Sequence, residues 1–263
     1  MNTMTLDKAR IKRSFAAASL TYDSVAGLQR AVGRELLNSI DATKLIGVLL
    51  DLGCGTGFLT GELLAHSNHE TIIALDIALS MLQTTQGKLA DKTIISYVCA
   101  DAEHLPIAAQ SIDSVFSNLA LQWCSNLDAV FTGIKRALKP EGQLVFSTFG
   151  PQTLHELKSA WSAVDNYNHV NAFYSEAQLR RFLQQAGFKN SQISSKLYTS
   201  RYDSVWTLMQ ELKRLGAHHV IAGRNKKITT KTAMQQMILA YEKYQVSDQI
   251  TATFEVISII AKV

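Results

Sequence analysis

A glycine-rich turn limits the folds open to this chain more than any other feature of its sequence. The run Leu50-Asp51-Leu52-Gly53-Cys54-Gly55-Thr56-Gly57 lies directly between an apolar stretch and a helical pattern. Glycines at this place let the backbone come close to a ligand at the carboxyl end of a strand. The spacing excludes the dinucleotide fingerprint G-x-G-x-x-G, because Phe58 takes the place of the third glycine. A Walker-type phosphate loop is also excluded, because no Gly-Lys-Ser/Thr follows.

Short apolar runs of strand type alternate with longer helical patterns on both sides of this turn. The order predicts βαβ units and a parallel sheet covered on both faces. Strands are predicted at 46–50, 71–75, 94–99, 112–117, 143–148, 191–202 and 251–263. Helices are predicted at 58–65, 80–89, 127–138, 152–164 and 175–186, with two or three more in 203–249. Pro140-Glu141-Gly142 is predicted to be the turn that leads into the fifth strand.

We interpret the 263 residues as one α/β domain, because 47% of them are hydrophobic and a chain of this length has ample core for one large domain. Residues 1–44 form an N-terminal helical arm, 45–150 a ligand-binding core and 151–263 a substrate-side half, with a helical cap at about 203–249 before the last strand. Three cysteines without C-x-x-C spacing indicate neither a disulfide framework nor a zinc site. No apolar run has the length of a signal peptide or a membrane span, so we expect a cytoplasmic protein.

Acidic residues follow the next two predicted strands at a regular interval. Asp76 comes 25 positions after Asp51, and Asp101 another 25 positions later. Together with the glycine turn, this pattern resembles the class I S-adenosylmethionine-dependent methyltransferases. The resemblance implies a Rossmann-like fold with a seven-stranded, mostly parallel sheet. It also implies that Asp76 accepts hydrogen bonds from the ribose hydroxyls and that Asp101-Ala102-Glu103 contacts the adenine. The cofactor-binding residues that it implies are Tyr22, Asp51, Gly53, Cys54, Gly55, Asp76, Ile77, Met81, Asp101, Ala102, Glu103, Asn118 and Leu119.

The residues after the fourth predicted strand argue against methylation of nucleic-acid bases. Amino-methyltransferases of nucleic acids carry Asp/Asn-Pro-Pro-aromatic at this place, whereas this chain has Asn118-Leu119-Ala120-Leu121. Cytosine C5 enzymes need a cysteine nucleophile after proline, and the chain contains no Pro-Cys pair.

Several segments carry a closer resemblance, to the malonyl-acyl-carrier-protein O-methyltransferases of biotin biosynthesis, over nearly the whole chain. In the arm these are Phe15-Ala16-Ala17-Ala18 to Tyr22-Asp23, and Leu28-Gln29-Arg30. More diagnostic are the run Ser117-Asn118-Leu119-Ala120-Leu121-Gln122-Trp123-Cys124 and, in the cap, Leu212-Lys213-Arg214-Leu215-Gly216-Ala217-His218 with Gly223-Arg224.

This resemblance implies methyl transfer from S-adenosylmethionine to the free carboxylate of a malonyl thioester, with S-adenosylhomocysteine as the other product. A malonyl carboxylate is ionised near pH 7, so no general base and no metal are required, and alignment in a closed site can suffice. Candidate groups that orient the carboxylate are Tyr22, Gln122, Trp123 and Arg224. Three of them have an alternative: Tyr22 contacts the cofactor's carboxylate, Trp123 is a core indole, and Arg224 is a surface charge. We expect neither Cys54 nor Cys124 to act as a nucleophile, and His218-His219 not to bind metal.

Basic residues are concentrated in the predicted cap. Between Lys196 and Lys231 lie eight basic and two acidic residues, although the formal charge of the whole chain is only +4. A basic cap above an active-site mouth would steer an acidic protein such as an acyl carrier protein, and the candidate docking residues are Lys213, Arg214, Lys226 and Lys227. The alternative is an ordinary solvated helix face. No basic run interleaved with aromatic residues supports nucleic acid as the partner.

Two other functions fit the same motifs. One is a class I methyltransferase that acts on a free small-molecule acid or a quinone-like acceptor. The other is a non-catalytic, cofactor-binding partner subunit, against which the intact Gly53, Gly55, Asp76 and Asp101 argue.

Overall fold

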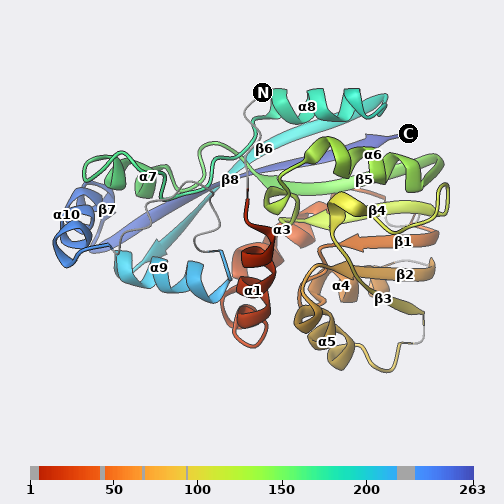
Figure 1. The fold of residues 1–263 in the computed structure, drawn as a ribbon, viewed down its shortest axis with the longest axis horizontal. Helices are drawn as coiled ribbons and strands as arrows, with labels where there is room; N and C mark the ends of the chain where they lie inside the picture. Colours follow the sequence, from red (N-terminus) through yellow and green to blue (C-terminus); the bar gives the residue numbers. More distant parts are fainter. Residues whose placement is uncertain (1–5, 42–44, 67–68, 93, 218–228) are drawn as a thin grey trace.

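A mixed sheet with helices on both faces forms the body of the protein in the computed structural model, which describes residues 6–41, 45–66, 69–92, 94–217 and 229–263 (Figure 1). The strands are β1 (Gly47–Leu52), β2 (His69–Asp76), β3 (Ile95–Cys99), β4 (Ile112–Asn118), β5 (Leu138–Phe149), β6 (Asn190–Tyr202), β7 (Gln245–Val246) and β8 (Gln249–Lys262).

The strand order is β3-β2-β1-β4-β5-β8-β6, with β7 paired to β8. The first five strands are parallel, and β8 runs antiparallel to both β5 and β6. The predicted sheet of seven mostly parallel strands is confirmed, and β7 is a two-residue addition that the sequence pattern did not predict. The chain order reverses between β1 and β4, and in open α/β sheets ligands bind outside the carboxyl ends of the strands at such a point.

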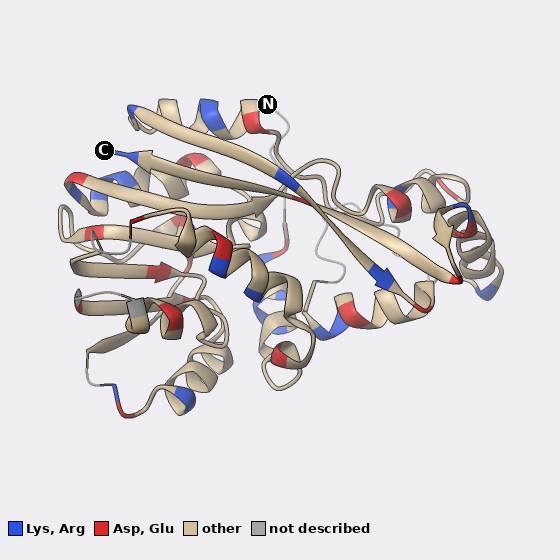
Figure 2. Ribbon diagram, turned by 180° about the vertical axis from the view of Figure 1, so that it is seen from behind, with Lys and Arg blue, Asp and Glu red and all other residues tan. Residues whose placement is uncertain are grey.

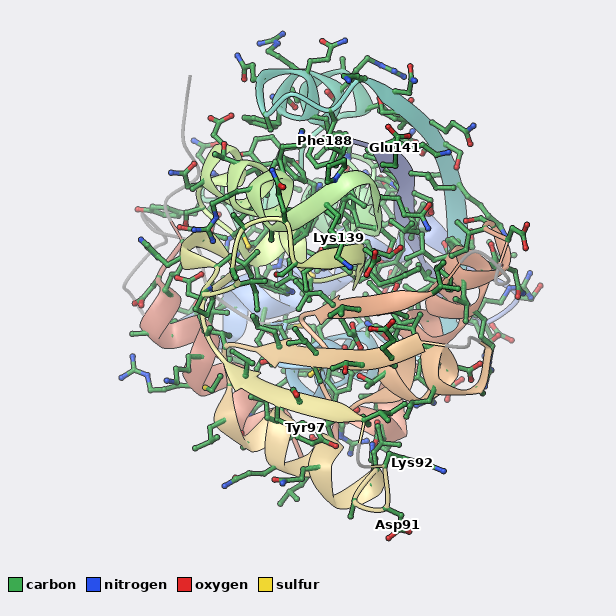
Figure 3. All side chains as sticks on the ribbon, turned by 90° about the vertical axis from the view of Figure 1, so that its right-hand side faces the viewer. Asp91, Lys92, Tyr97, Lys139, Glu141 and Phe188 are labelled. Carbon is green, nitrogen blue, oxygen red and sulfur yellow. The ribbon has the colours of Figure 1, made fainter. Side chains whose placement is uncertain are left out.

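Helices of the core divide between the two faces of the sheet. They are α3 (Gly27–Asn38), α4 (Phe58–His66), α5 (Leu79–Lys88), α6 (Leu127–Ala137) and α8 (Glu176–Gln185). On one face, α6 and α8 pack with Phe131, Ile134 and Leu183 on buried strand residues. On the other face, Leu36 and Leu63 of α3 and α4 pack against buried strand residues such as Phe116. Figure 3 shows the two helical layers, with Tyr97 on the edge strand β3 and Phe188 next to α8.

A second apolar core lies where β6 and β8 extend beyond the parallel strands (Figure 1). It is formed with α7 (His155–Ser162), α9 (Val205–Arg214) and α10 (Lys231–Tyr241), and the short 3₁₀ helix η4 (Glu242–Tyr244) leads into β7. Leu208, Met237 and Tyr241 are fully buried there. Because α9 and α10 both lie between β6 and β8 in the chain, the predicted cap before the last strand is confirmed.

The arm consists of α1 (Lys8–Ala18), α2 (Tyr22–Val25) and α3. In Figure 1 α1 lies between the parallel core and the extension that carries the cap. The cap reaches the arm directly, because Thr21 Oγ1 donates to the carbonyl oxygen of Arg214 over 3.2 Å. No helix in the described ranges combines the length and the apolar character that crossing a membrane requires.

Two details of the predicted elements were wrong. The fifth strand begins at Leu138, before the predicted turn, because Leu138 already pairs with Ile112; the register then shifts, and pairing resumes at Gln143 opposite Ser114. The helix predicted at 152–164 is shorter, since α7 covers only His155–Ser162. The helix predicted at 175–186 is confirmed, and Ser175 forms a capping box with Gln178 at its start.

Candidate functional site

The glycine-rich turn connects β1 to α4 and has little room for side chains. A Cβ atom on Gly53, whose φ is +80°, would lie 2.4 Å from Cβ of Ala120 in the segment after β4. A Cβ on Gly55, whose φ is +54°, would meet nothing within 4 Å. The turn therefore packs closely against the β4 end on one side and borders open space at Gly55.

Asp76, the last residue of β2, braces this turn. Its Oδ2 accepts a hydrogen bond from the backbone N–H of Gly55 over 3.0 Å, and its Oδ1 accepts from that of Ala78 over 2.8 Å. Burial raises the pKa of Asp76, and the backbone hydrogen bonds oppose that rise. Each oxygen of an ionised carboxylate has two lone pairs, so Asp76 retains one acceptor position on each oxygen.

A cavity lies at the carboxyl ends of β1, β2 and β4. We call it the main cavity. Of the residues predicted to bind the cofactor or the substrate, those that line it are Tyr22, Gly53, Gly55, Asp76, Ile77, Met81, Asp101, Ala102, Asn118, Leu119 and Trp123. The parallel strands bring residues from four separate stretches of the chain to one edge, and the arm adds Tyr22.

The main cavity is closed on one side by residues of α1 that sequence reasoning missed. Ile11 and Phe15 line it, and Phe15 meets the ring of Trp123 edge to face at a centroid distance of 5.3 Å. Ile11 and Phe15 lie four positions apart, on one face of α1. Nothing in the local sequence indicated what that face covers.

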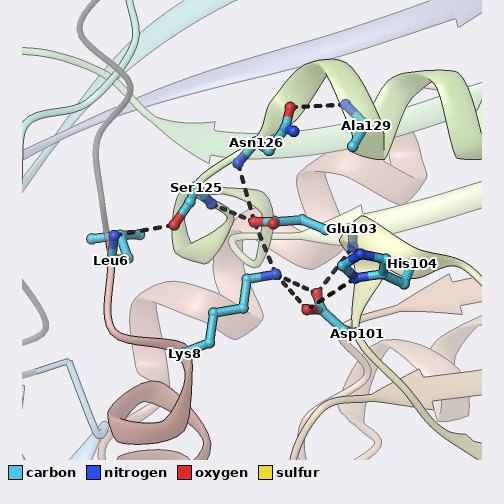
Figure 4. A network of polar contacts seen from close by, with 8 residues as sticks. All are labelled: Leu6, Lys8, Asp101, Glu103, His104, Ser125, Asn126 and Ala129. Carbon is cyan, nitrogen blue, oxygen red and sulfur yellow. Dashed lines mark hydrogen bonds and ion pairs between the residues drawn. The ribbon is translucent and has the colours of Figure 1, made fainter.

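Lys8, at the first position of α1, holds the arm to the segment after β3 (Figure 4). Its Nζ lies 2.5 Å from Oδ2 of Asp101 and 2.9 Å from Oε1 of Glu103. Burial disfavours the charge of Lys8, but hydrogen bonds to the two carboxylates raise its pKa. Asp101 also loses solvent, yet the hydrogen bonds from Lys8 and from the backbone of Glu103 lower its pKa. Both Lys8 and Asp101 line the main cavity.

Glu103 does not line the main cavity, although it was predicted to contact the adenine. Its Oε1 accepts from the backbone N–H groups of Ser125 and Asn126, over 2.5 and 3.1 Å. Ser125 in turn accepts from the backbone N–H of Leu6 through its Oγ. Figure 4 shows these contacts joining the start of the arm, the segment after β3 and the start of α6.

Gln122 is turned away from the main cavity, whereas its neighbour Trp123 lines it. The two lie in the 3₁₀ helix η3 (Leu121–Trp123). The amide of Gln122 donates to the carbonyl oxygen of Leu119 over 2.6 Å and accepts from Thr148 Oγ1 over 3.4 Å. The side chain thus stabilises the backbone after β4, where Leu119 has a φ of 48°.

Asp51 and Cys54 also lie outside the main cavity. Asp51 is 1% exposed and accepts from Thr60 Oγ1 over 2.6 Å. Burial raises the pKa of Asp51 to about 7, and the nearby carboxylate of Asp76 adds to the rise. Both residues line a second, smaller cavity on the α3 and α4 side of the turn.

The cysteines do not have the surroundings of nucleophiles. Burial raises the pKa of Cys54 well above its ordinary value and that of Cys124 to about 12. Reactive cysteines need the opposite shift, because the thiolate is the nucleophile. Among the described residues, no group of three or more histidine, cysteine or acidic side chains could hold a metal ion.

The candidate docking residues divide into two sets. Lys213 and Arg214 are exposed at the end of α9, which lies against the arm. Figure 2 shows basic residues at this end of α9. Arg224, Lys226 and Lys227, like His218-His219, lie outside the described residues.

The sequence is similar to a known family model and to individual known proteins. A family model described as a methyltransferase domain matches residues 50–146. The malonyl-acyl-carrier-protein O-methyltransferase of Methylovorus sp. is 40% identical over 262 residues, which cover 96% of this chain and 88% of that protein. The biotin biosynthesis bifunctional protein BioHC of Cellvibrio japonicus is 42% identical over 254 residues, which cover 95% of this chain and 49% of that protein.

The fold also resembles solved structures. Phosphoethanolamine N-methyltransferase 2 of Haemonchus contortus, in complex with S-adenosyl-L-methionine, superposes with a TM-score of 0.59 at 16% sequence identity. The match covers 94% of this chain and 57% of that one. At this identity the similarity shows a shared fold alone.

Proposed function

The chain belongs to the malonyl-acyl-carrier-protein O-methyltransferase family, and from this premise we propose that it methylates the free carboxylate of a malonyl group carried as a thioester on an acyl carrier protein. S-adenosylmethionine is the methyl donor, and the product is the malonyl methyl ester that enters biotin synthesis. The observation that carries the proposal is the main cavity, which joins Asp76, Asp101 and Trp123 under the arm.

The residues of the main cavity fit the proposed cofactor. Asp76 borders it with one acceptor position left on each oxygen, which suits the two hydroxyls of a ribose. Gly55 leaves the space beside Asp76 open. Asp101 and Ala102 also line the main cavity and offer an adenine both polar and apolar surface.

When bound, S-adenosylmethionine supplies a methyl group activated by a positively charged sulfur. The attacking oxygen of the malonyl carboxylate is already ionised at neutral pH, so the protein has to orient this group and remove its water. Ile11, Phe15 and Leu119 give the main cavity an apolar wall that serves the second purpose.

Two side chains of the main cavity can donate hydrogen bonds that orient the malonyl carboxylate. Burial raises the pKa of Tyr22, with the nearby Asp76 and Asp23 adding to the rise, so its hydroxyl stays protonated. Trp123 offers an indole N–H in the same cavity. Tyr22 and Trp123 are therefore the candidates for orienting the substrate carboxylate, and Arg224 stays a candidate from its sequence context. Gln122 acts on the backbone of Leu119.

The acidic carrier protein is proposed to dock on Lys213 and Arg214 at the basic end of α9, and Lys226 and Lys227 stay candidate docking residues from the sequence alone. The position of the end of α9 supports this docking site. Thr21, one residue before Tyr22, donates a hydrogen bond to the carbonyl oxygen of Arg214. Charges at this end of α9 thus stand beside the arm that encloses the main cavity. A positive surface here would accelerate encounter with a negatively charged protein.

Intact-mass spectrometry tests the function. Malonyl-acyl carrier protein incubated with the enzyme and S-adenosylmethionine should gain the mass of one methyl group in place of a proton, whereas acetyl-acyl carrier protein, which lacks the free carboxylate, should gain nothing. Methylation of free malonate at a comparable rate would assign the enzyme to free small acids instead.

A further inference from the structure

Leu119 has a backbone conformation that leucine rarely adopts. It follows directly after β4, and its φ of 48° lies in the left-handed region. This region is costly for most residues other than glycine, because the Cβ atom comes too close to the following carbonyl oxygen. Such a residue persists only where its surroundings impose the conformation, and such residues are concentrated at functional sites. Leu119 lines the main cavity, so its neighbours impose this conformation at the cavity wall.

Ser147 of β5 holds the backbone N–H of Leu119. This N–H donates to Ser147 Oγ over 3.0 Å and to the carbonyl oxygen of Ser147 over 3.1 Å. Ser147 is fully buried, and its hydroxyl donates to Oδ1 of Asn118 over 2.8 Å. Nδ2 of Asn118 donates in turn to the carbonyl oxygen of Gln29 in α3, also over 2.8 Å. A chain of hydrogen bonds therefore joins β5, the end of β4 and the arm around Leu119.

Gln122 holds the carbonyl oxygen of the same residue. Its Nε2 donates to this oxygen over 2.6 Å, and its Oε1 accepts from Thr148 Oγ1 over 3.4 Å. One side chain thus binds the N–H of Leu119 and another binds its carbonyl group. We call Ser147 and Gln122 the clamp of Leu119.

The conformation of Leu119 sets the course of the residues that follow it. Ala120 comes next and packs on the glycine-rich turn, where a Cβ atom on Gly53 would lie 2.4 Å from its own Cβ. The N–H of Trp123 donates to the carbonyl oxygen of Ala120 over 3.1 Å. Ala120 and Trp123 both line the main cavity. A right-handed Leu119 would redirect the chain and displace both residues, because φ and ψ are the soft dihedrals of the backbone.

We propose that Ser147 and Gln122 are positioning residues for the methyl transfer, because they hold Leu119 in the conformation that places Trp123 along the main cavity. The inference rests on the proposed function, in which Trp123 is a candidate for orienting the substrate carboxylate. Gln122 then acts through the backbone and not by contact with the substrate. Misplacement of an orienting group lowers the rate of the chemical step more than the affinity. The clamp is therefore needed for turnover rather than for binding.

The test removes the two groups of the clamp one at a time. Gln122→Met loses the amide at nearly constant length, and Ser147→Ala loses the hydroxyl. The matched controls are Gln143→Met and Ser114→Ala, because Gln143 Nε2 donates to Ser114 Oγ over 3.2 Å between the same two strands. Neither control residue lines the main cavity. For each variant, kcat and KM are measured on malonyl-acyl carrier protein, the affinity for S-adenosylhomocysteine by calorimetry, and the free energy of unfolding in urea.

We expect Gln122→Met to lower kcat by about 10- to 100-fold, the range for a displaced orienting group. Its KM for malonyl-acyl carrier protein and its affinity for S-adenosylhomocysteine should each change by less than about 3-fold. Ser147→Ala should lose less of kcat, because the carbonyl oxygen of Ser147 still accepts from Leu119. The two controls should lower stability but leave kcat within about 2-fold of wild type.

A glycine at position 119 shows whether Gln122 acts through the backbone. Glycine adopts the left-handed region without steric cost, so the clamp has less to hold in Leu119→Gly. This variant should itself be slower, because the cavity wall loses a side chain. In the presence of Leu119→Gly, however, the further change Gln122→Met should lower kcat by less than about 3-fold, and the double-mutant cycle measures this coupling.

An equal loss of kcat from Gln122→Met with Leu119 and with glycine at position 119 would show that Gln122 acts on the substrate itself, and would overturn the proposal. So would a folded Gln122→Met variant with kcat within about 2-fold of wild type, or a loss that changes in KM and affinity explain completely. Should Gln122→Met fail to fold, Ser147→Ala gives the same comparison. Failure of the proposed function looks different, because wild-type protein would then not methylate malonyl-acyl carrier protein.

Discussion

Lys8 Nζ and Asp101 Oδ2 lie 2.5 Å apart and join the first turn of the arm to the segment after β3, 93 residues away in the sequence. Both residues border the main cavity, so the same ion pair closes the arm and forms part of the wall. We expect this contact to slow the release of a bound cofactor.

Lys8→Met should accelerate cofactor release. The ion pair is partly shielded from solvent, and such pairs contribute on the order of 1 kcal/mol, so the dissociation rate of S-adenosylhomocysteine should rise about 3- to 10-fold. Stopped-flow displacement measures this rate. Lys12→Met is the control, because Lys12 is exposed on the same helix, and an equal effect there would argue for a general charge effect.

Asp76→Ala should weaken S-adenosylmethionine by about 1.5–3 kcal/mol, the range for hydrogen bonds to a charged acceptor. It should also lower the free energy of unfolding, since the backbone N–H groups of Gly55 and Ala78 lose their acceptor. Asp113→Ala separates the two effects, because Asp113 accepts from the backbone of Val48 but does not line either cavity. Calorimetry on this control should show reduced stability with unchanged affinity.

The buried Asp51 predicts a pH dependence of stability. Its pKa is raised to about 7 in the folded protein, from an ordinary value of 3.8, mainly by burial. The folded state therefore keeps a proton that the unfolded chain has lost, and Asp51 lowers stability progressively as the pH rises through this window. Urea unfolding of the ligand-free protein measures this effect. The free energy of unfolding of Asp51→Asn should increase relative to that of wild type between pH 4 and pH 7, and the difference should stay constant above pH 7. A pH-independent difference between the two proteins would contradict the assignment.

Cys54→Ala should retain most of the methyl-transfer activity. The thiol is buried and its pKa is raised, so it does not supply a thiolate. Alkylation by iodoacetamide should modify the exposed Cys99 well before Cys54 or Cys124. Loss of turnover in a folded variant with normal cofactor affinity would point to a nucleophilic role.

Charge reversal at the end of α9 tests carrier docking. The double variant Lys213→Glu with Arg214→Glu should lower kcat/KM on malonyl-acyl carrier protein by about 10-fold or more at low salt and flatten its salt dependence, because steering is screened by ions. The control is Lys189→Glu with Lys262→Glu, an equal change of charge at exposed residues far from α9 along β6 and β8. If both pairs lower the rate equally, net charge rather than docking at α9 is responsible.

The sequence alone determined the order of the main strands and helices, and it predicted the edge of the sheet at which a ligand would bind. Apolar runs and helical periodicity are local signals, and the glycine turn and Asp76 could be placed near each other because parallel strands end at a common edge. Asn118 and Leu119 follow β4 and reach the same edge for the same reason.

Only the tertiary structure decided how the arm meets that edge. Helices α1 and α3 pack on residues about 90 to 110 positions away in the sequence. This packing sets the contact of Lys8 with Asp101, the cover formed by Phe15 and the approach of Gln29 to Asn118. The same holds for Gln122, whose amide turns to Leu119 and away from the cavity beside its neighbour Trp123. Periodicity encodes which face of a helix is buried, but the partner of that face is set by the free energy of packing the whole chain.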